Sequence, residues 1–244
     1  MSKVYIRKDK NGEFENINQY TAYKGFKELG FEIVFFNNIE EIIDNKPEDI
    51  VVGYIGDVRA ILKKLGKDYP EMNYPEELHK YMGRNLWQDK LNNIVNNPDK
   101  WGVFIKQAQG TKQFTGKVIN KISDLRSVIG VDPETLVWCS DVVEFVSEWR
   151  CFIRYGEVIA VKQYNGRWDK PINFEILKSA VLDYTESPNA YVIDLGVTDK
   201  GETLLVEVND GYSVGCYGLD PIKYAKFLSA RWSELTHTED LCNF

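Results

Sequence analysis

The sequence predicts an α/β protein, α+β overall, in which a small parallel α/β subdomain is followed by β-rich segments. Two observations support this prediction. Short apolar strands alternate with amphipathic helices from Val4 to Gly66, which is the pattern of a parallel sheet with crossover helices. From Val103 onward, apolar strands follow one another across short polar turns, which is typical of hairpins and β-rich lobes.

The first part of the chain divides into short elements. We expect strands at 4–6, 31–36 and 50–53, and helices at 19–29, 39–43 and 58–65. Gly30 and Gly66 follow two of these helices, and glycine is favoured just past a helix C-terminus. The turn-rich segment 68–75 marks the end of the subdomain. We therefore predict an N-terminal unit at 1–83.

Two further helices are predicted after this boundary, at 76–82 and 84–96, with Pro98 stopping the second. Next comes a short apolar strand that ends in Lys106, a loop of Gln, Gly and Thr at 109–116, and a strand that begins at Lys117. Lysines can reach phosphates as point charges, and exposed backbone N–H groups can contact phosphate oxygens. The loop does not end in the Gly-Lys-Ser/Thr of a Walker motif. Its composition indicates a mobile lid.

A β-hairpin is predicted after the apolar stretch 136–143. Its turn lies at 155–157, and strand alternation places Arg150 and Arg154 on one face. An arginine among apolar neighbours is costly unless it meets an anion. A salt bridge to Glu148 or Glu157 is the structural alternative, which we favour for Arg154, whereas for Arg150 we favour a bound anion.

Three oxygen-bearing side chains lie on the next two predicted strands, 191–194 and 204–209. Because side chains alternate along a strand, Glu207 and Asn209 share a face, and the partner strand can place Asp194 opposite them. Carboxylate and amide oxygens suit Mg²⁺. The alternative is local: Asp194 could open a strand, and Asn209 could begin a turn, for backbone reasons alone.

Composition excludes several classes of protein. The 244 residues are 43% hydrophobic with a formal charge of −7, so we expect a globular chain that binds no nucleic acid. The four cysteines lack C-x-x-C spacing and there are two histidines, which argues against a zinc or thiolate metal site. We see no signal peptide and no stretch that could span a membrane. The expected location is cytoplasmic.

The order of these motifs is similar to that of an ATP-grasp domain, in particular to a clade named for one arginine and two lysines. The resemblance covers about residues 84–220 and rests most on Glu207-Val-Asn209. It implies two β-rich lobes with ATP between them, at 84–143 and 144–244. It also implies an ATP- and Mg²⁺-dependent carboxylate–amine ligase that works through an acylphosphate. The substrates would be a small-molecule or peptide carboxylate and an amine.

The resemblance also implies residue roles. Adenine would contact the connector near Cys139 and Val142, and the ribose would contact Glu144. Phosphates would be held by Lys106 and Lys117, and Mg²⁺ by Asp194, Glu207 and Asn209. Charge at the reacting centre would be stabilised by Arg150 and Lys162. Two alternatives stay open: a phosphotransferase on the same fold, and a nucleotide-binding module without turnover. The predicted helix at 221–235 has an apolar face that could pack internally or across a homodimer.

Overall fold

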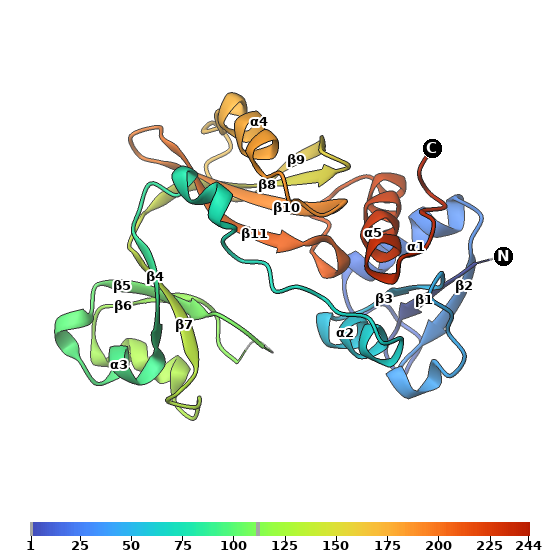
Figure 1. The fold of residues 1–244 in the computed structure, drawn as a ribbon, viewed down its shortest axis with the longest axis horizontal. Helices are drawn as coiled ribbons and strands as arrows, with labels where there is room; N and C mark the ends of the chain where they lie inside the picture. The colour runs from blue at the N-terminus through green and yellow to red at the C-terminus, as the bar shows by residue number, and fades with distance from the viewer. Residues whose placement is uncertain (1, 111–112) are drawn as a thin grey trace.

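The computed structural model describes residues 2–110 and 113–244. Three sheets organise these residues: a three-stranded sheet of order β2-β1-β3 and two four-stranded sheets of orders β4-β7-β5-β6 and β11-β10-β8-β9. We call them the N-terminal, small-lobe and large-lobe sheets. The small lobe lies to one side of the large-lobe sheet, and the N-terminal sheet lies at its other end (Figure 1).

The N-terminal sheet is parallel, as predicted, and its strands alternate with helices. Its elements are β1 (Lys3–Arg7), α1 (Ile17–Glu28), β2 (Glu32–Phe36), the 3₁₀ turn η1 (Ile39–Glu41), β3 (Ile50–Val52) and α2 (Ile55–Lys64). The side chain of Asn16 accepts hydrogen bonds from the first turn of α1, which explains why that helix begins there. The strands and helices predicted between Val4 and Gly66 are thereby confirmed to within a few residues.

The C-terminal helix α5 (Pro221–Thr236) packs internally on α1. The two helices approach closely at Gly25, where a Cβ atom would overlap the Pro221 carbonyl oxygen. A residue without a side chain is therefore required at this position. Together α1, α5 and the N-terminal sheet form one hydrophobic core with Phe152, Ala190 and Val192 of the large-lobe sheet.

The small lobe contains the clearest difference from the sequence prediction. The segment predicted as one helix at 84–96 is a strand, β4 (Leu86–Lys90), followed by a short helix, α3 (Leu91–Val95). β4 pairs antiparallel with β7, with Trp87 opposite Cys139. This pairing joins segments about fifty positions apart, and such tertiary contacts override local helix propensity. The helix prediction for 84–90 was therefore wrong.

The remaining elements of the small lobe follow the predicted order. They are η3 (Pro98–Lys100), β5 (Val103–Gln107), β6 (Lys117–Ile119), η4 (Ile122–Val128) and β7 (Leu136–Asp141). The 3₁₀ helix η2 (Glu76–Tyr81), just before this lobe, packs on the large lobe instead. β5 pairs antiparallel with both β6 and β7. The strand–loop–strand arrangement predicted around Lys106 and Lys117 is confirmed.

The large lobe is an antiparallel sheet that carries one helix on its outer face. Its elements are β8 (Phe145–Arg154), β9 (Glu157–Gly166), α4 (Phe174–Asp183), β10 (Ala190–Thr198), β11 (Thr203–Asp210) and η5 (Gly211–Ser213). Both predicted hairpins, β8–β9 and β10–β11, are present. All residues of β10 are buried, since this central strand has packed groups on both faces. Across the described part of the chain, no helix is both long and apolar enough to cross a lipid bilayer.

Candidate active site

Four charged side chains form one row across the large-lobe sheet. Strand register places Glu207 of β11 opposite Asp194 of β10, Asp194 opposite Arg150 of β8, and Arg150 opposite Lys162 of β9. Residues that are directly opposite on neighbouring strands share a face of the sheet. Residues separated by up to 57 positions in the sequence, Arg150 and Glu207, are therefore brought into one transverse row, which we call the charge row.

Arg150 and Asp194 form the centre of the charge row. Nε and Nη2 of Arg150 donate to the two carboxylate oxygens of Asp194 over 2.8 and 2.6 Å. Burial raises the pKa of the Asp194 carboxyl to about 6, although Arg150 acts in the opposite direction. The rings of Tyr217 and Tyr164 lie 4.8 and 5.8 Å from the guanidinium carbon. The partner of Arg150 is thus neither Glu148 nor Glu157, whereas Arg154 forms a salt bridge with Asp240.

Glu207 links the two lobes. One carboxylate oxygen accepts a hydrogen bond from Lys106 of β5 over 2.7 Å, and the other accepts one from Asn209 over 2.8 Å. The second contact confirms that Glu207 and Asn209 share a face. Burial alone would raise the pKa of Glu207, but Lys106 and Asn209 outweigh burial and lower it. Burial likewise disfavours the charged form of Lys106, yet Glu207 outweighs this effect and the pKa of Lys106 is raised.

A cavity of about 570 Å³ lies where these groups meet. Phe104 and Lys106 line it from the small lobe, and Val206, Glu207 and Asn209 line it from the large lobe. The cavity also reaches the N-terminal layer, where Ile55, Gly56 and Arg59 line it. A second cavity of about 550 Å³ adjoins the segment 70–75, and no residue of the charge row is among its described lining residues.

The residues at the cavity fit a hard divalent cation by their chemistry. Glu207 and Asn209 offer a carboxylate and an amide oxygen, the donors that Mg²⁺ takes in part while it keeps water or phosphate oxygens. Within the described residues, no group of three or more His, Cys, Asp or Glu side chains could hold a metal ion. Both carboxylate oxygens of Asp194 accept hydrogen bonds from Arg150, and Asp194 is only 1% exposed. The metal role predicted for Asp194 therefore requires Arg150 to move and stays a prediction.

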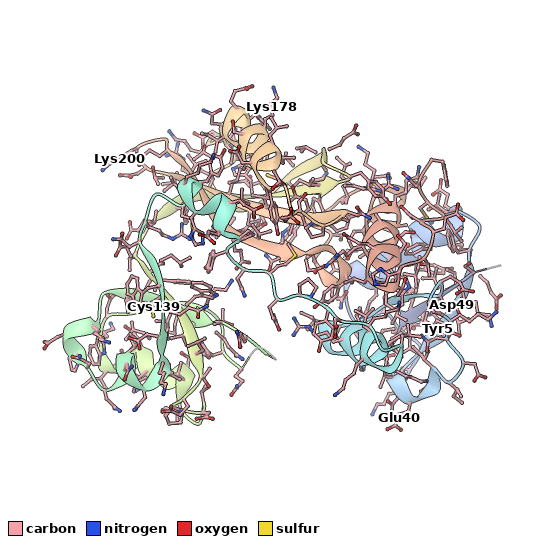
Figure 2. The ribbon with its side chains drawn as sticks, viewed as in Figure 1. Tyr5, Glu40, Asp49, Cys139, Lys178 and Lys200 are labelled. Atoms are coloured by element: carbon pink, nitrogen blue, oxygen red, sulfur yellow. The ribbon has the colours of Figure 1, made fainter. Side chains whose placement is uncertain are left out.

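Two of the predicted nucleotide ligands lie away from the cavity. Lys117 is opposite Ile105 in the β5–β6 pairing, so it shares the core-facing side of the small-lobe sheet with Ile105, whereas Lys106 points to the other side. Cys139 lies within β7 (Figure 2), between β4 and β5, and is fully buried. Burial raises the pKa of its thiol to about 12. These positions argue against direct contacts from Lys117 and Cys139.

The connector between β7 and β8 contains the other two predicted ligands. Val142 and Glu144 belong to neither strand, and both are exposed. Their backbone polar groups lie outside the sheet ladders, which leaves them available to a planar ring. The adenine and ribose contacts predicted for Val142 and Glu144 are compatible with this arrangement and stay predictions.

Sequence reasoning missed Arg84 and Tyr74. The guanidinium of Arg84 donates to the backbone oxygens of Met82, Leu205 and Val206, which joins the start of the small lobe to the edge of β11. The Tyr74 ring lies 4.9 Å from the Lys106 ammonium. No local pattern marked these residues, because Arg84 was assigned to a helix and Tyr74 to a turn. The lid predicted at 109–116 includes Thr111 and Lys112, which lie outside the described residues.

Residues 81–227 match the profile of an ATP-grasp domain, the second family of the clade named for one arginine and two lysines. This match spans more than half of the chain, and the protein belongs to this family of ATP-grasp domains. No curated protein matches the chain in sequence.

Solved structures of ATP-grasp enzymes share the fold over nearly the whole chain. D-cycloserine synthetase DcsG superposes with a TM-score of 0.61 at 10% identity, covering 95% of this chain and 100% of that one. D-alanine–D-alanine ligase from Bacillus anthracis superposes with a TM-score of 0.57 at 16% identity, covering 97% of this chain and 98% of that one. The ATP-grasp ligase PsnB complexed with a minimal precursor superposes with a TM-score of 0.55 at 11% identity, covering 95% of this chain and 99% of that one. At these identities the similarity is one of fold.

Proposed function

We propose that the protein is an ATP- and Mg²⁺-dependent ligase that joins a carboxylate to an amine and releases ADP and phosphate. The observation that supports this most is the charge row beside the cavity, with Glu207 and Asn209 facing the cavity and Lys106 opposite them. Phosphoryl transfer depends mainly on positioning and charge neutralisation. Cations and metal-binding oxygens are therefore sufficient for this chemistry without a nucleophilic side chain.

ATP would lie between the two lobes. Phe104 and Val206 offer apolar surface from opposite sides of the cavity, which suits a purine ring. Lys106 would exchange Glu207 for a phosphate oxygen, because an ammonium group binds either anion as a point charge. Val142 and Glu144 would meet the adenine and the ribose. Lys117 is retained as a phosphate ligand only if the small lobe rearranges when ATP binds.

Mg²⁺ would be held by Glu207 and Asn209, with Asp194 as the third predicted ligand. When bound, the cation would neutralise phosphate charge. The residues of this chain do the rest of the positioning. Asn209 is tied to Glu207 by a 2.8 Å hydrogen bond, which fixes both side chains on the cavity side of β11.

The proposed reaction has two steps. A substrate carboxylate oxygen attacks the γ-phosphorus of ATP, the bond to the bridging oxygen breaks, and ADP leaves. The amine nitrogen then attacks the carbonyl carbon of the acylphosphate, the carbon–oxygen bond to phosphate breaks, and the nitrogen loses a proton as the amide forms. Arg150 and Lys162 would stabilise the negative charge that develops at this centre. In the charge row, Arg150 lies next to Asp194 and Lys162 lies next to Arg150.

The substrate class follows from the similar structures only in outline. These structures include an ATP-grasp ligase complexed with a minimal precursor, a D-alanine–D-alanine ligase and a D-cycloserine synthetase. We propose a small-molecule or peptide carboxylate and an amine for this chain as well.

The decisive experiment follows ATP consumption with Mg²⁺ across pooled amino acids and short peptides, with ADP and AMP separated by chromatography. Acceptor-dependent release of ADP is expected. Release of AMP and pyrophosphate would overturn the acylphosphate mechanism. A stable phosphorylated product without an amide would identify a phosphotransferase, and ATP binding without turnover for any acceptor would identify a binding module.

A further inference from the structure

The cavity has a second end, which is lined partly by residues outside the range matched by the family profile. Ile55, Gly56 and Arg59 of α2 line this end, together with Tyr212 and Val214. The matched range begins at residue 81, so the family match assigns no role to the α2 residues. They lie opposite the small lobe, beyond the metal-binding oxygens of Glu207 and Asn209.

Arg59 is held firmly in the cavity wall. Its Nε donates to the Tyr212 hydroxyl over 2.8 Å, and its guanidinium carbon lies 4.8 Å from the Tyr69 ring. The side chain of Arg59 is 15% exposed. An arginine that is fixed on one edge and stacked on a ring has already lost most of its rotamer freedom, so it can bind an anion at a smaller entropic cost.

The present partner of Arg59 can be exchanged. Nη2 donates to Glu71 over 3.1 Å, and the Glu71 side chain is 37% exposed on the segment that joins α2 to the small lobe. Within the described residues, Nη1 of Arg59 has no hydrogen-bond partner. Because an ion pair with one solvent-exposed partner contributes little, a ligand carboxylate can replace Glu71 and bind the guanidinium through two hydrogen bonds.

We infer that Arg59 binds the unreacted carboxylate of an α-amino acid that serves as the amine substrate. This inference rests on the proposed function. The reacting carboxylate and the phosphates require the cations beside Glu207, so an anion site at the far end takes a group that is not consumed. An α-amino acid is the smallest substrate that carries an amine and such a carboxylate together.

The first turn of α2 supports the same assignment. Ile55 and Gly56 line the cavity, and a Cβ at Gly56 would meet no atom within 4 Å, so the space above this turn is open. The amino end of a helix favours anions. Arg59 carries the recognition, and the amino end of α2 adds only its backbone dipole, because Asp57 in the same turn is engaged by Arg7 and by the Tyr54 backbone.

The test measures binding, so it does not depend on turnover. The full chain, with ADP and Mg²⁺ present, is titrated calorimetrically with each proteinogenic α-amino acid and with the corresponding amino-acid amide, whose carboxylate is replaced by a neutral group. At least one amino acid is expected to bind, and its amide is expected to bind at least about tenfold more weakly, because a charge-assisted pair is lost. If no amino acid binds, the inference is wrong.

Two substitutions with opposite expected signs test the role of Arg59. Arg59→Gln is expected to weaken binding of the amino acid by about 10- to 100-fold and to leave binding of the amide unchanged. Glu71→Gln is expected to strengthen binding of the amino acid, because the internal competitor is removed. Lys63→Gln, an exposed charge change on the same helix, is the matched control and is expected to change neither.

The contrary results are equally specific. If Arg59→Gln weakens the acid and the amide equally, or if Glu71→Gln weakens the amino acid, Arg59 has only a structural role. ADP release is recorded separately for the wild type. This second assay contains ATP, Mg²⁺, the amino acid and pooled small-molecule and peptide carboxylates as first substrates. An amino acid that binds through Arg59 but causes no ADP release with any of these carboxylates would leave this subsite in place and refute the proposed ligase activity.

Discussion

The two ion pairs at the candidate site differ in what they connect. Arg150 and Asp194 lie on adjacent strands of one sheet, form two hydrogen bonds, and have side chains 10% and 2% exposed. Lys106 and Glu207 lie on different lobes and form one hydrogen bond, and their side chains are 15% and 28% exposed. The first pair is part of the sheet, whereas the second is a contact between lobes that a bound phosphate can replace. Stability and ligand binding should therefore depend on different pairs.

The largest expected effect concerns the pair within the sheet. Arg150→Ala leaves the buried Asp194 carboxylate without its partner, and breaking one side of a buried ion pair costs about 3–5 kcal/mol. Denaturant unfolding of the metal-free protein at neutral pH would measure this loss. A loss below about 1 kcal/mol would show that Asp194 finds another partner and that the pair is not a fixed part of the sheet.

The next effect concerns activity. Glu207→Gln removes a cavity carboxylate and Asn209→Ala removes its neighbour, and each is expected to lower turnover by about 100- to 1000-fold, the cost of losing one preorganised charge-stabilising group. The thermal unfolding temperature should change little, because both residues face the cavity. Steady-state ADP release and thermal unfolding would be compared for both variants. Parallel losses of stability and turnover would argue that these residues are structural.

The pH dependence of stability separates burial from ion pairing at Asp194. Its pKa is raised to about 6 from 3.8, so its contribution is fully present below pH 3.8 and is lost as pH rises through about 6. The Asp194→Asn variant has no titrating group at this position. Relative to it, the free energy of unfolding of the wild type should fall by up to about 3 kcal/mol between pH 4 and pH 7. Denaturant unfolding without Mg²⁺ at several pH values measures this difference. A change of opposite sign would show that Arg150 outweighs burial.

The smallest effect concerns the pair between the lobes. Lys106→Ala should reduce stability by about 1 kcal/mol or less, because Glu207 keeps its hydrogen bond to Asn209. The same substitution should weaken ATP binding by about 10- to 100-fold, the value of one charge-assisted hydrogen bond. Calorimetric titration with ATP and Mg²⁺ measures the affinity, with Lys121→Ala, an exposed lysine of the small lobe that does not line the cavity, as the matched control. Unchanged affinity in Lys106→Ala would remove its phosphate role.

Local patterns in the sequence were sufficient for part of the site. Alternation along one strand places Glu207 and Asn209 on one face, and a short turn brings Asp194 opposite them; the structure confirms both relations. Asp194 lies in the middle of β10, so the alternative in which it opens a strand is wrong. These relations depend on neighbours within about twenty residues, where periodicity and turn chemistry determine geometry.

The rest depends on contacts that no local pattern reveals. β8 pairs with β10 although β9 and α4 separate them in the sequence, and only this pairing gives Arg150 its partner. The sequence alone therefore predicted a bound anion for Arg150, with the local residues Glu148 and Glu157 as the structural alternative. β4 was missed because its partner β7 is distant in the chain. The side on which Lys117 lies depends on its register with Ile105 across a loop, and a shift of one residue would have reversed it.

The close approach of α1 and α5 has a consequence for how the chain is made. The N-terminal sheet shares its core with residues 221–236, so strands β1 to β3 leave the ribosome before the helix that completes their core has been synthesised. Domains generally fold as units, and incomplete ones expose apolar surface. We therefore expect release of nascent chains that stop before residue 221 to give insoluble protein, although every residue of the charge row has by then been translated.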